Sequence, residues 1–419
     1  MAVETGRHDV EAAPRSRGAV LGQWNSAVTS YYLLAGASGL LIAIGLVMVL
    51  SSSSVSALSD GGSAYSIFSN QAKFALIGLP FAWVASRLPI HVYKRFSWHV
   101  LGVAVVLQLL VFTSLGVMVN GNRNWLDIGG GQRLQPSELA KLALAIWLAA
   151  VLARKRPLLD RWMHVLVPGV VVATGMIGLV LLGSDLGTAI ILLVLVAGAL
   201  FVAGVPLRMF GVAGSVAIVA VVLLVQSGNR RMARIEAHFS PDCDTQGICY
   251  QTTRGMYGLA SGGLTGVGMG ESREKWSYLP EAHNDFIFAI LGEELGLLGT
   301  LLVLALFGVL AIAMTRVIQR HTDPFVQIAT AGIGAWVLGQ ALINIAVVIG
   351  LLPVIGVPLP LVSAGGSALI TTMIGLGVVL SFARQEPGAA EALGARAAVV
   401  RRSLAVVAAS SRRSRSRRA

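Results

Sequence analysis

Charged residues are scarce in this chain. Only 12% of its 419 residues are Asp, Glu, Lys or Arg, whereas 55% are hydrophobic, and the mean hydropathy is +0.75. This balance excludes a soluble globular protein of such length and indicates a polytopic membrane protein. The sequence also lacks a P-loop, a dinucleotide-binding glycine fingerprint, an HExxH pair and a detectable internal repeat. We therefore expect no nucleotide cofactor and no nucleotide-driven transport.

Apolar runs of about 20 residues, the length that crosses the hydrocarbon core of a bilayer, recur along the chain. We expect an all-α fold with about ten transmembrane helices. The predicted spans are Tyr32–Leu50, Lys73–Leu88, Val100–Val119, Leu139–Leu152, His164–Leu182, Leu186–Val205, Met209–Gln226, Phe286–Met314, Ile328–Gly350 and Leu359–Phe382.

The positions of Lys and Arg predict the orientation, because positive charge in short loops is retained in the cytoplasm. Basic clusters precede the first predicted span and follow the second and the fourth, and basic residues recur at Arg208, Arg316 and Arg320. This alternation predicts cytoplasmic termini and an extracytoplasmic loop of about residues 227–284, between the seventh and eighth helices. The first span is too long and too late for a cleaved signal peptide, so we expect a signal anchor.

The terminal segments carry much of the net charge of +12. Residues 1–28 and 386–419 are expected to be cytoplasmic extensions with little fold of their own, on either side of a membrane domain of residues 29–385. The final SRRSRSRRA suits attraction to anionic membrane lipid, or alternatively docking of a partner. No folded soluble module accompanies this run, so we expect no nucleic-acid binding.

Cysteine is also scarce, and Cys243 and Cys249 both fall in the predicted outer loop. The extracytoplasmic side is oxidising, which favours a structural disulfide, with two free thiols as the alternative. A zinc site is poorly supported, because no further Cys or suitably spaced His accompanies the pair.

The densest group of ionisable side chains lies where this loop enters the eighth span. The segment YLPEAHNDFIFAILGEELGLLG contains Glu281, His283, Asp285, Glu293 and Glu294. A carboxylate in a bilayer costs about 2.5–3.5 kcal/mol on insertion scales, so intramembrane acids indicate a functional site by default. The structural alternatives are helix capping by Asp285 or His283, and packing roles for the two adjacent glutamates.

A second group of candidates lies in NGNRNWLDIGGGQRLQPSELAKLALA. Cations beside an aromatic ring, here Arg123 and Lys141 near Trp125, suit a phosphate ester or diphosphate. The alternative is an Arg123–Asp127 ion pair, with Lys141 extending toward the membrane surface.

Two further outward turns are candidates. Asp185 follows a Gly-Ser turn and either caps the next helix or supplies a carboxylate to a site. The segment LLPVIGVPLPLVSAGGSAL contains Ser363, Gly365 and Gly366, and its prolines and glycines break regular helix near the membrane surface. Broken backbone at that depth survives only against protein or a wet cavity, so this segment is expected to line the same groove or to form a reentrant loop.

These segments resemble the SEDS family (shape, elongation, division and sporulation), whose members polymerise the peptidoglycan precursor lipid II. The resemblance rests on GNRNW with QPSELAKL, SDLGT, SGGLTGVGMGESREKWSYLPEAHNDFIFAILGEELG and NIAVVIGLLPVIGVPLPLVSAGGSA, in family order over nearly the whole membrane region. YLPEAHNDFIFAI and LLPVIGVPLPLVSAGGS are more similar to the cell-division members than to the elongation members. Departures occur at Ser184 and Arg254, where many members carry other residues.

The resemblance implies a glycosyl transfer in which a sugar hydroxyl attacks an anomeric carbon and undecaprenyl diphosphate leaves. Asp285 matches the essential aspartate of the family, and we expect it to be the general base. Cations or a divalent metal, Mg or Mn, would stabilise the leaving diphosphate, with Glu138 and Asp185 as candidate metal ligands. The predicted substrate-binding residues are Arg123, Trp125, Lys141, Lys275, Glu281, His283, Ser363, Gly365 and Gly366.

The resemblance also implies partners and a location. SEDS polymerases work beside a class B penicillin-binding protein, a transpeptidase, and the division members act with other divisome proteins at the septal plasma membrane. The alternatives are a lipid II flippase without chemistry, a scaffold that recruits a transpeptidase, and an elongation or sporulation paralogue with the same chemistry.

Overall fold

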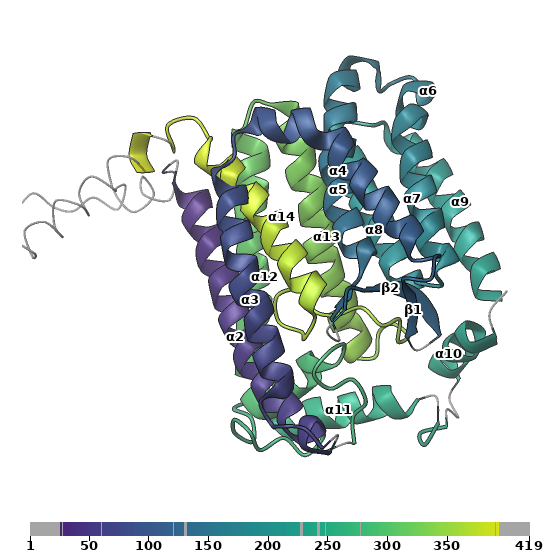
Figure 1. Cartoon of the computed structure of the whole chain (residues 1–419), viewed down its shortest axis with the longest axis vertical. Helices are drawn as coiled ribbons and strands as arrows, with labels where there is room; N and C mark the ends of the chain where they lie inside the picture. Colours follow the sequence, from purple (N-terminus) through teal and green to yellow (C-terminus); the bar gives the residue numbers. More distant parts are fainter. Residues whose placement is uncertain are drawn as a thin grey trace, which may run out of the picture.

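The computed structural model describes residues 26, 28–59, 61–119, 121–129, 132–226, 229–240, 244–247, 249–276, 278–389 and 391–393. Long helices run side by side along the molecule (Figure 1). They are α2 (Thr29–Ser59), α3 (Ser66–Arg87), α4 (Ile90–Leu110), α5 (Pro136–Lys155), α7 (Val171–Leu182), α8 (Leu186–Ala203), α9 (Leu207–Gln226), α12 (Ile287–Arg320), α13 (Pro324–Val348) and α14 (Gly366–Arg384). Shorter elements are the helices η1 (Arg156–Leu158), α6 (Trp162–Val165), η2 (Leu166–Val170), α10 (Asn229–Phe239) and α11 (Tyr250–Gly262).

Each predicted apolar run overlaps one of these helices or the α6–η2–α7 series. Seven helices of the described chain are long and apolar enough to cross a membrane by length and composition. The protein is therefore a mostly helical membrane protein, and the total of ten crossings stays a prediction.

The expectation of an all-α fold was wrong in one region. A three-stranded antiparallel sheet follows α4, in the order β1 (Gly116–Val119), β2 (Asn122–Asp127), β3 (Arg133–Leu134). The third predicted span, Val100–Val119, therefore ends too late, because α4 ends at Leu110. The helix also begins before the predicted span, at Ile90.

The tenth predicted span was also too long. Residues 351–365 are not helical, and α14 begins only at Gly366. Three prolines, Pro353, Pro358 and Pro360, lie in this stretch and supply no backbone N–H for a helical ladder. The break in regular helix expected for this segment is therefore confirmed, and only the start of the predicted span at Leu359 was too early.

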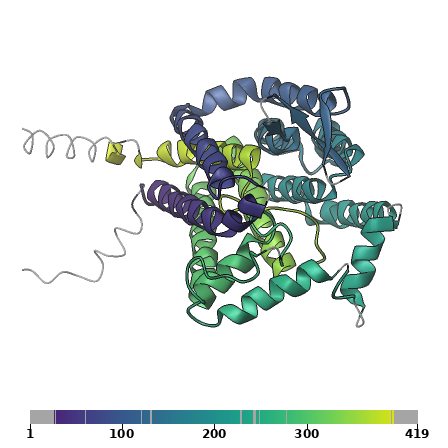
Figure 2. The same cartoon turned by 60° about the horizontal axis from the view of Figure 1, so that its bottom comes forward.

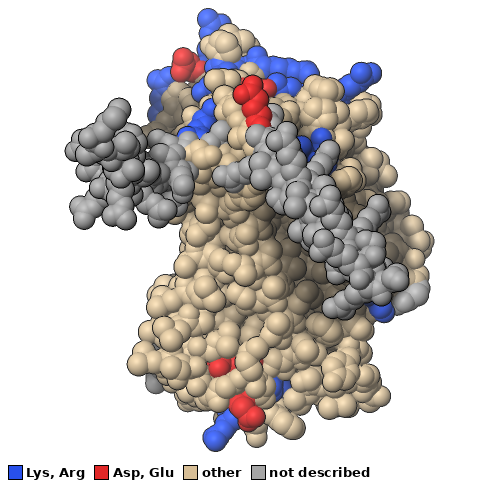
Figure 3. Space-filling view, turned by 90° about the vertical axis from the view of Figure 1, so that its left-hand side faces the viewer, with Lys and Arg blue, Asp and Glu red and all other residues tan. Residues whose placement is uncertain are grey.

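Figure 3 shows how charge is distributed on one face of the molecule. Most of the visible Lys and Arg gather at the end that carries α6, and a broad uncharged band covers the middle. The opposite end carries α10, α11 and the sheet. Figure 2 brings that end forward, with the sheet on one side and α11 on the other. This distribution is consistent with a membrane around the uncharged band, and the assignment of the basic end to the cytoplasm stays a prediction.

Small residues permit close helix packing, as expected where lipid removes the usual hydrophobic drive between helices. Helix α5 lies among α4, α8 and α13, and nearly all of it from Pro136 to Leu152 is buried. Gly255, Gly258 and Gly262 lie on the face of α11 that packs against α12. A Cβ on Gly262 would lie 2.0 Å from the carbonyl oxygen of Gly292.

We expect Gly262→Ala to destabilise the protein by about 1–3 kcal/mol, because a backbone atom cannot give way to the added methyl group. Gly211→Ala on α9 is the matched control, since a Cβ there meets nothing within 4 Å. Thermal unfolding of both purified variants in detergent checks this. Equal midpoints for the two variants would contradict the packing account.

Helix α12 is interrupted at Gly296, whose φ of 67° favours glycine. The break removes helical partners from nearby peptide groups, and the loop after α11 replaces them. The replacement bonds run from Val267 N–H to Glu293 O (3.0 Å), from Gly268 N–H to Glu294 O (3.2 Å), from Leu297 N–H to Gly263 O (2.9 Å) and from Leu298 N–H to Leu264 O (3.2 Å). The part of α12 before Gly296 is thereby a separate short helix that packs against this loop.

Candidate functional site

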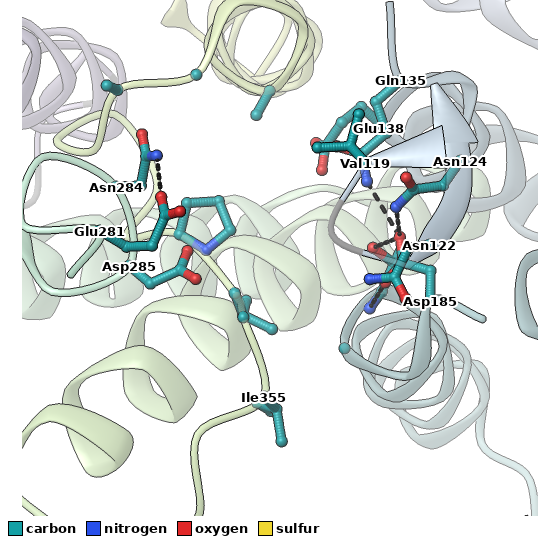
Figure 4. Close-up of a pocket in the computed structure, with 18 of the residues that line it drawn as sticks. Val119, Asn122, Asn124, Gln135, Glu138, Asp185, Glu281, Asn284, Asp285 and Ile355 are labelled. Atoms are coloured by element: carbon teal, nitrogen blue, oxygen red, sulfur yellow. Dashed lines mark hydrogen bonds between the residues drawn. The ribbon is translucent and has the colours of Figure 1, made fainter. Parts of the chain in front are cut away.

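A cavity of about 1170 Å³ lies between the sheet, the N-terminal ends of α5 and α8, and the loop that precedes α12. Figure 4 shows acidic residues on two facing walls. Glu281 and Asp285 stand on one wall, and Glu138 and Asp185 stand on the other. The cavity therefore brings together segments that are far apart in the sequence.

Asp285 is partly exposed and lines this cavity. Its Oδ2 would lie 3.6 Å from a Cβ placed on Gly356, so the carboxylate faces the irregular segment 351–365. The N-cap residue of α12 is Phe286, so Asp285 does not occupy the capping position considered as its structural alternative.

The backbone that carries Asp285 is held by side chains from two other segments. Asn344 on α13 donates from Nδ2 to the carbonyls of Asp285 (2.7 Å) and Val357 (2.7 Å). Ser363 donates from Oγ to the carbonyl of Asn284 (2.7 Å). These hydrogen bonds fix the backbone from which the Asp285 carboxylate projects before a substrate arrives.

Asp185 is the N-cap of α8, so the capping interpretation is confirmed. Its Oδ1 accepts from the backbone N–H of Thr188 (2.9 Å). Its Oδ2 accepts from the Thr188 hydroxyl (2.8 Å), from Asn124 (3.0 Å) and from Gln135 (3.1 Å). These four hydrogen bonds connect the sheet to the start of α5 and to α8. They leave the Asp185 carboxylate little capacity to act as a metal ligand.

Lys141 lines the same wall and is only 1% exposed. Its Nζ is ion-paired with Glu138 (2.7 Å), donates to Gln340 (2.9 Å) and lies 5.2 Å from the centre of the Trp336 ring. Glu138 Oε2 is buried without a hydrogen-bond partner among the described residues. The pair is therefore close to neutral and keeps one acceptor oxygen unused.

The remaining predicted residues divide into two sets. Five of them line the cavity: Trp125, Glu281, His283, Gly365 and Gly366. Three are not among the lining residues: Arg123, Lys275 and Ser363.

Each of these three is engaged elsewhere. Ser363 acts through the backbone that precedes Asp285, as described above. The guanidinium of Arg123 donates to the carbonyl of Thr113 (2.8 Å) within the sheet region. The predicted alternative pair with Asp127 is not among the ion pairs of the described residues. Lys275 is buried and belongs to a different cluster.

In that cluster Lys275 is ion-paired with Glu294 (3.1 Å), which also accepts from the hydroxyl of Ser51 on α2 (2.6 and 2.7 Å). Glu293 accepts from the hydroxyl of Ser272 (2.5 Å) and the backbone N–H of Arg273 (2.9 Å). The packing interpretation of the two glutamates is thus confirmed, because they bind the loop after α11 to α12 and α2.

Several cavity residues escaped the sequence prediction. They are amides rather than charges: Gln71, Asn124, Gln135 and Gln340 line the cavity, and Asn344 supports its wall through the carbonyls of Asp285 and Val357. Gln71 donates to the carbonyl of Ser363 (3.1 Å) and accepts from the N–H of Gly365 (3.0 Å). A usable signal was present in α13, where Gln340 and Asn344 are four residues apart on one face of an apolar helix. Polar groups so placed have to find partners inside the protein.

The predicted disulfide concerns Cys249, the residue before α11, and Cys243. Cys243 lies outside the described residues, and the pairing stays a prediction.

The pKa of the Glu274 carboxyl is raised from its usual 4.5. Burial is the main cause; the Arg254 guanidinium, 3.7 Å away, lowers the pKa, and the Glu293 carboxylate raises it. Glu274 lies in the loop that packs on α12, outside the membrane-spanning helices.

We expect Glu274→Gln to stabilise the protein more at neutral pH than at pH 4.5, the usual carboxyl value. The raised pKa means that the folded state binds this proton more tightly than the unfolded chain. The contribution of Glu274 to stability is therefore full below the unfolded pKa and is lost as pH rises through the folded pKa. Unfolding midpoints of wild type and variant across this range check the prediction, and a constant difference between them would refute it.

The fold and the cavity together define a class of protein: a polytopic helical membrane protein with an acidic cavity near one end of its helices. A family model described as cell cycle protein, covering FtsW, RodA and SpoVE, matches residues 31–387. The chain therefore belongs to this family, which is the SEDS family that its sequence segments resemble.

Individual relatives support the same assignment. The chain is 41% identical over 386 residues to a probable peptidoglycan glycosyltransferase FtsW of Mycobacterium tuberculosis, covering 92% of this chain and 73% of the relative. It is 36% identical over 348 residues to the protein of that name from Coxiella burnetii, covering 82% and 93%.

Solved structures show the same fold. The crystal structure of the Thermus thermophilus rod shape determining protein RodA matches with a TM-score of 0.64 and 27% identity, covering 85% of this chain and 97% of that one. A chain from a structure described as structural coordination of polymerization and crosslinking by a peptidoglycan synthase complex matches with a TM-score of 0.70 and 27% identity, covering 84% and 96%.

Proposed function

We propose that this chain is a peptidoglycan glycosyltransferase of cell division, which polymerises lipid II into glycan strands and releases undecaprenyl diphosphate. The observation that carries the proposal is the position of Asp285, held by its backbone at one wall of a large polar cavity. Membership of a family whose curated relatives are named peptidoglycan glycosyltransferases supports it.

Asp285 is the proposed general base. A sugar hydroxyl is a weak nucleophile, so a carboxylate has to accept its proton as the new bond forms. The hydroxyl oxygen attacks the anomeric carbon, the bond from that carbon to the diphosphate oxygen breaks, and its electron pair leaves with the diphosphate. The hydrogen bonds from Asn344 and Ser363 to residues 285 and 284 hold the backbone that carries this carboxylate in place.

The cavity carries negative charge, which would disfavour a leaving diphosphate unless a cation is present. Four carboxylates line it, Glu138, Asp185, Glu281 and Asp285, and Lys141 is already paired with one of them. The donor set suits a divalent cation bound partly by substrate: Mg²⁺ usually takes one or two carboxylates and completes its shell with phosphate oxygens and water. Glu138 Oε2, buried without a partner among the described residues, is the proposed ligand. The cation would neutralise the leaving diphosphate.

We accordingly expect chelation of divalent cations to reduce strand formation by at least tenfold, with recovery when Mg²⁺ or Mn²⁺ is restored. Unchanged thermal unfolding of the chelated protein would separate this effect from loss of structure. Full activity in excess chelator would exclude the proposed role of the cation.

The proposal extends to partners and location. One structural relative is described in terms of both polymerization and crosslinking, which supports a class B penicillin-binding protein as the partner of this chain. We place the chain in the plasma membrane at the division septum, among other divisome proteins, with both termini and the basic tail in the cytoplasm.

The proposed function is tested with purified protein, its class B partner, labelled lipid II and a divalent cation. Glycan strands on a gel are the expected result. A protein that instead moves lipid II across vesicles without making strands would be a flippase, and the proposal would fail.

A further inference from the structure

A second cavity, of about 770 Å³, adjoins the candidate active site. The two cavities share Gln251, Pro353 and Val354 among their lining residues. Gln251 marks the junction, where its Nε2 donates to the carbonyl of Pro280 (3.1 Å). A ligand bound in the first cavity can therefore extend past Gln251 into the second.

The second cavity differs from the first in charge. Its described lining residues include no Asp, Glu, Lys or Arg, whereas the first cavity contains four carboxylates. It presents hydroxyl groups and aromatic rings instead, among them Ser240, Thr245, Thr252, Thr253, Tyr250 and Tyr257. Hydroxyls both donate and accept hydrogen bonds, and a tyrosine ring offers an apolar face with a polar tip. Such a surface suits uncharged, hydroxyl-rich rings, whereas among its described lining residues a diphosphate would find no Lys or Arg, only His238 and hydroxyl donors.

Helix α11 provides the rigid wall of this cavity. The glycine face of the helix, which includes Gly255 and Gly262, packs against α12, and Tyr257 stands on the other side with 58% of its surface exposed. The Arg254 guanidinium makes a cation–π contact with Tyr250, 5.2 Å from the centre of its ring, and this contact restrains the ring. The two tyrosines thus lie on α11, which packs against α12, the helix that follows Asp285.

We propose that this second cavity binds the sugar rings of the glycan strand next to the reacting bond. The inference rests on the proposed function and adds that two parts of the substrate bind in two different cavities. The charged diphosphate end occupies the acidic cavity, and the uncharged saccharide part occupies the hydroxyl and tyrosine surface beyond Gln251. The volume lies within the range of about 300–1,000 Å³ that is usual for ligand sites.

The test uses the full-length purified protein and a soluble N-acetylglucosamine tetramer, which carries the sugar chemistry without peptide, lipid or phosphate. Binding is measured by saturation-transfer NMR. We expect Tyr257→Ala and Thr253→Val each to weaken binding at least fivefold, and Tyr257→Phe to retain it because the ring remains. Tyr65→Ala is the matched control, since Tyr65 is 63% exposed and lines neither cavity.

Equal tetramer binding by wild type, Tyr257→Ala and Thr253→Val would overturn the inference. So would displacement of the bound tetramer by free stem peptide, which would assign the surface to the peptide. Strand formation from lipid II is measured in parallel. Strands without Tyr257-dependent tetramer binding would reject the sugar site alone, whereas Tyr257-dependent binding without any strands would reject the proposed function and leave the site standing.

Discussion

Asp285→Asn is expected to lower the rate of strand formation by about 10²- to 10⁴-fold, the usual contribution of a general base. Asparagine keeps the size of the side chain but cannot accept the proton of the attacking hydroxyl. The main-chain bonds from Asn344 to residue 285 and from Ser363 to residue 284 do not involve this carboxylate, so the fold should be preserved. Strand formation on gels, together with the unfolding midpoint, measures the two effects separately.

Asp185→Asn is the informative comparison on the facing wall of the cavity. Asp185 accepts four hydrogen bonds and caps α8, so its loss should lower stability as well as activity. A large loss of rate with unchanged stability at Asp185, and none at Asp285, would reverse the assigned roles.

Glu294→Ala is expected to lower the free energy of unfolding by about 3–5 kcal/mol, because it leaves Lys275 as a buried charge without its partner. Glu294 is 1% exposed and Lys275 is 4% exposed, so water cannot compensate. The loop after α11 would lose one of its attachments to α12, and Ser51 on α2 would lose its bonds to Glu294, so activity should fall as well. Denaturation of the purified variant in detergent measures the change.

Two comparisons sharpen this prediction. The double variant Lys275→Met with Glu294→Met should recover much of the lost stability, since it removes both charges. Lys94→Met, which breaks the half-exposed pair with Asp323, should cost no more than about 1 kcal/mol. Similar losses for Glu294→Ala and Lys94→Met would contradict the role of burial.

Much of the fold was predictable because apolar runs of membrane length have few alternatives in a bilayer. The errors have specific causes. Residues 111–119 are apolar enough to extend a helix, yet β1 pairs with β2 there, and pairing between strands is a property of two segments that periodicity in one cannot reveal. The irregular stretch after α13 was expected to be broken, but its length depends on contacts with Gln340 and Asn344.

The site was predictable to a different degree at different residues. Asp285 was found through its motif, and the structure places it at the cavity. Lys275 was predicted to bind substrate because it is a cation near that motif. Its ammonium group instead pairs with Glu294, 19 residues further along the chain. The sequence shows which charged residues are present. Whether Lys275 pairs with Glu294 depends on the conformation of the loop after α11, which the break in α12 at Gly296 allows.

The most direct test of the central claim follows binding and bond formation in one sample. Wild type and Asp285→Asn are loaded with the same labelled lipid II, unbound lipid is removed, and the first glycosidic bond is timed after addition of a divalent cation. The account predicts equal amounts of bound lipid II, with bond formation by the wild type and almost none by the variant. Bond formation at equal rates in both would contradict the assignment of Asp285 as the base.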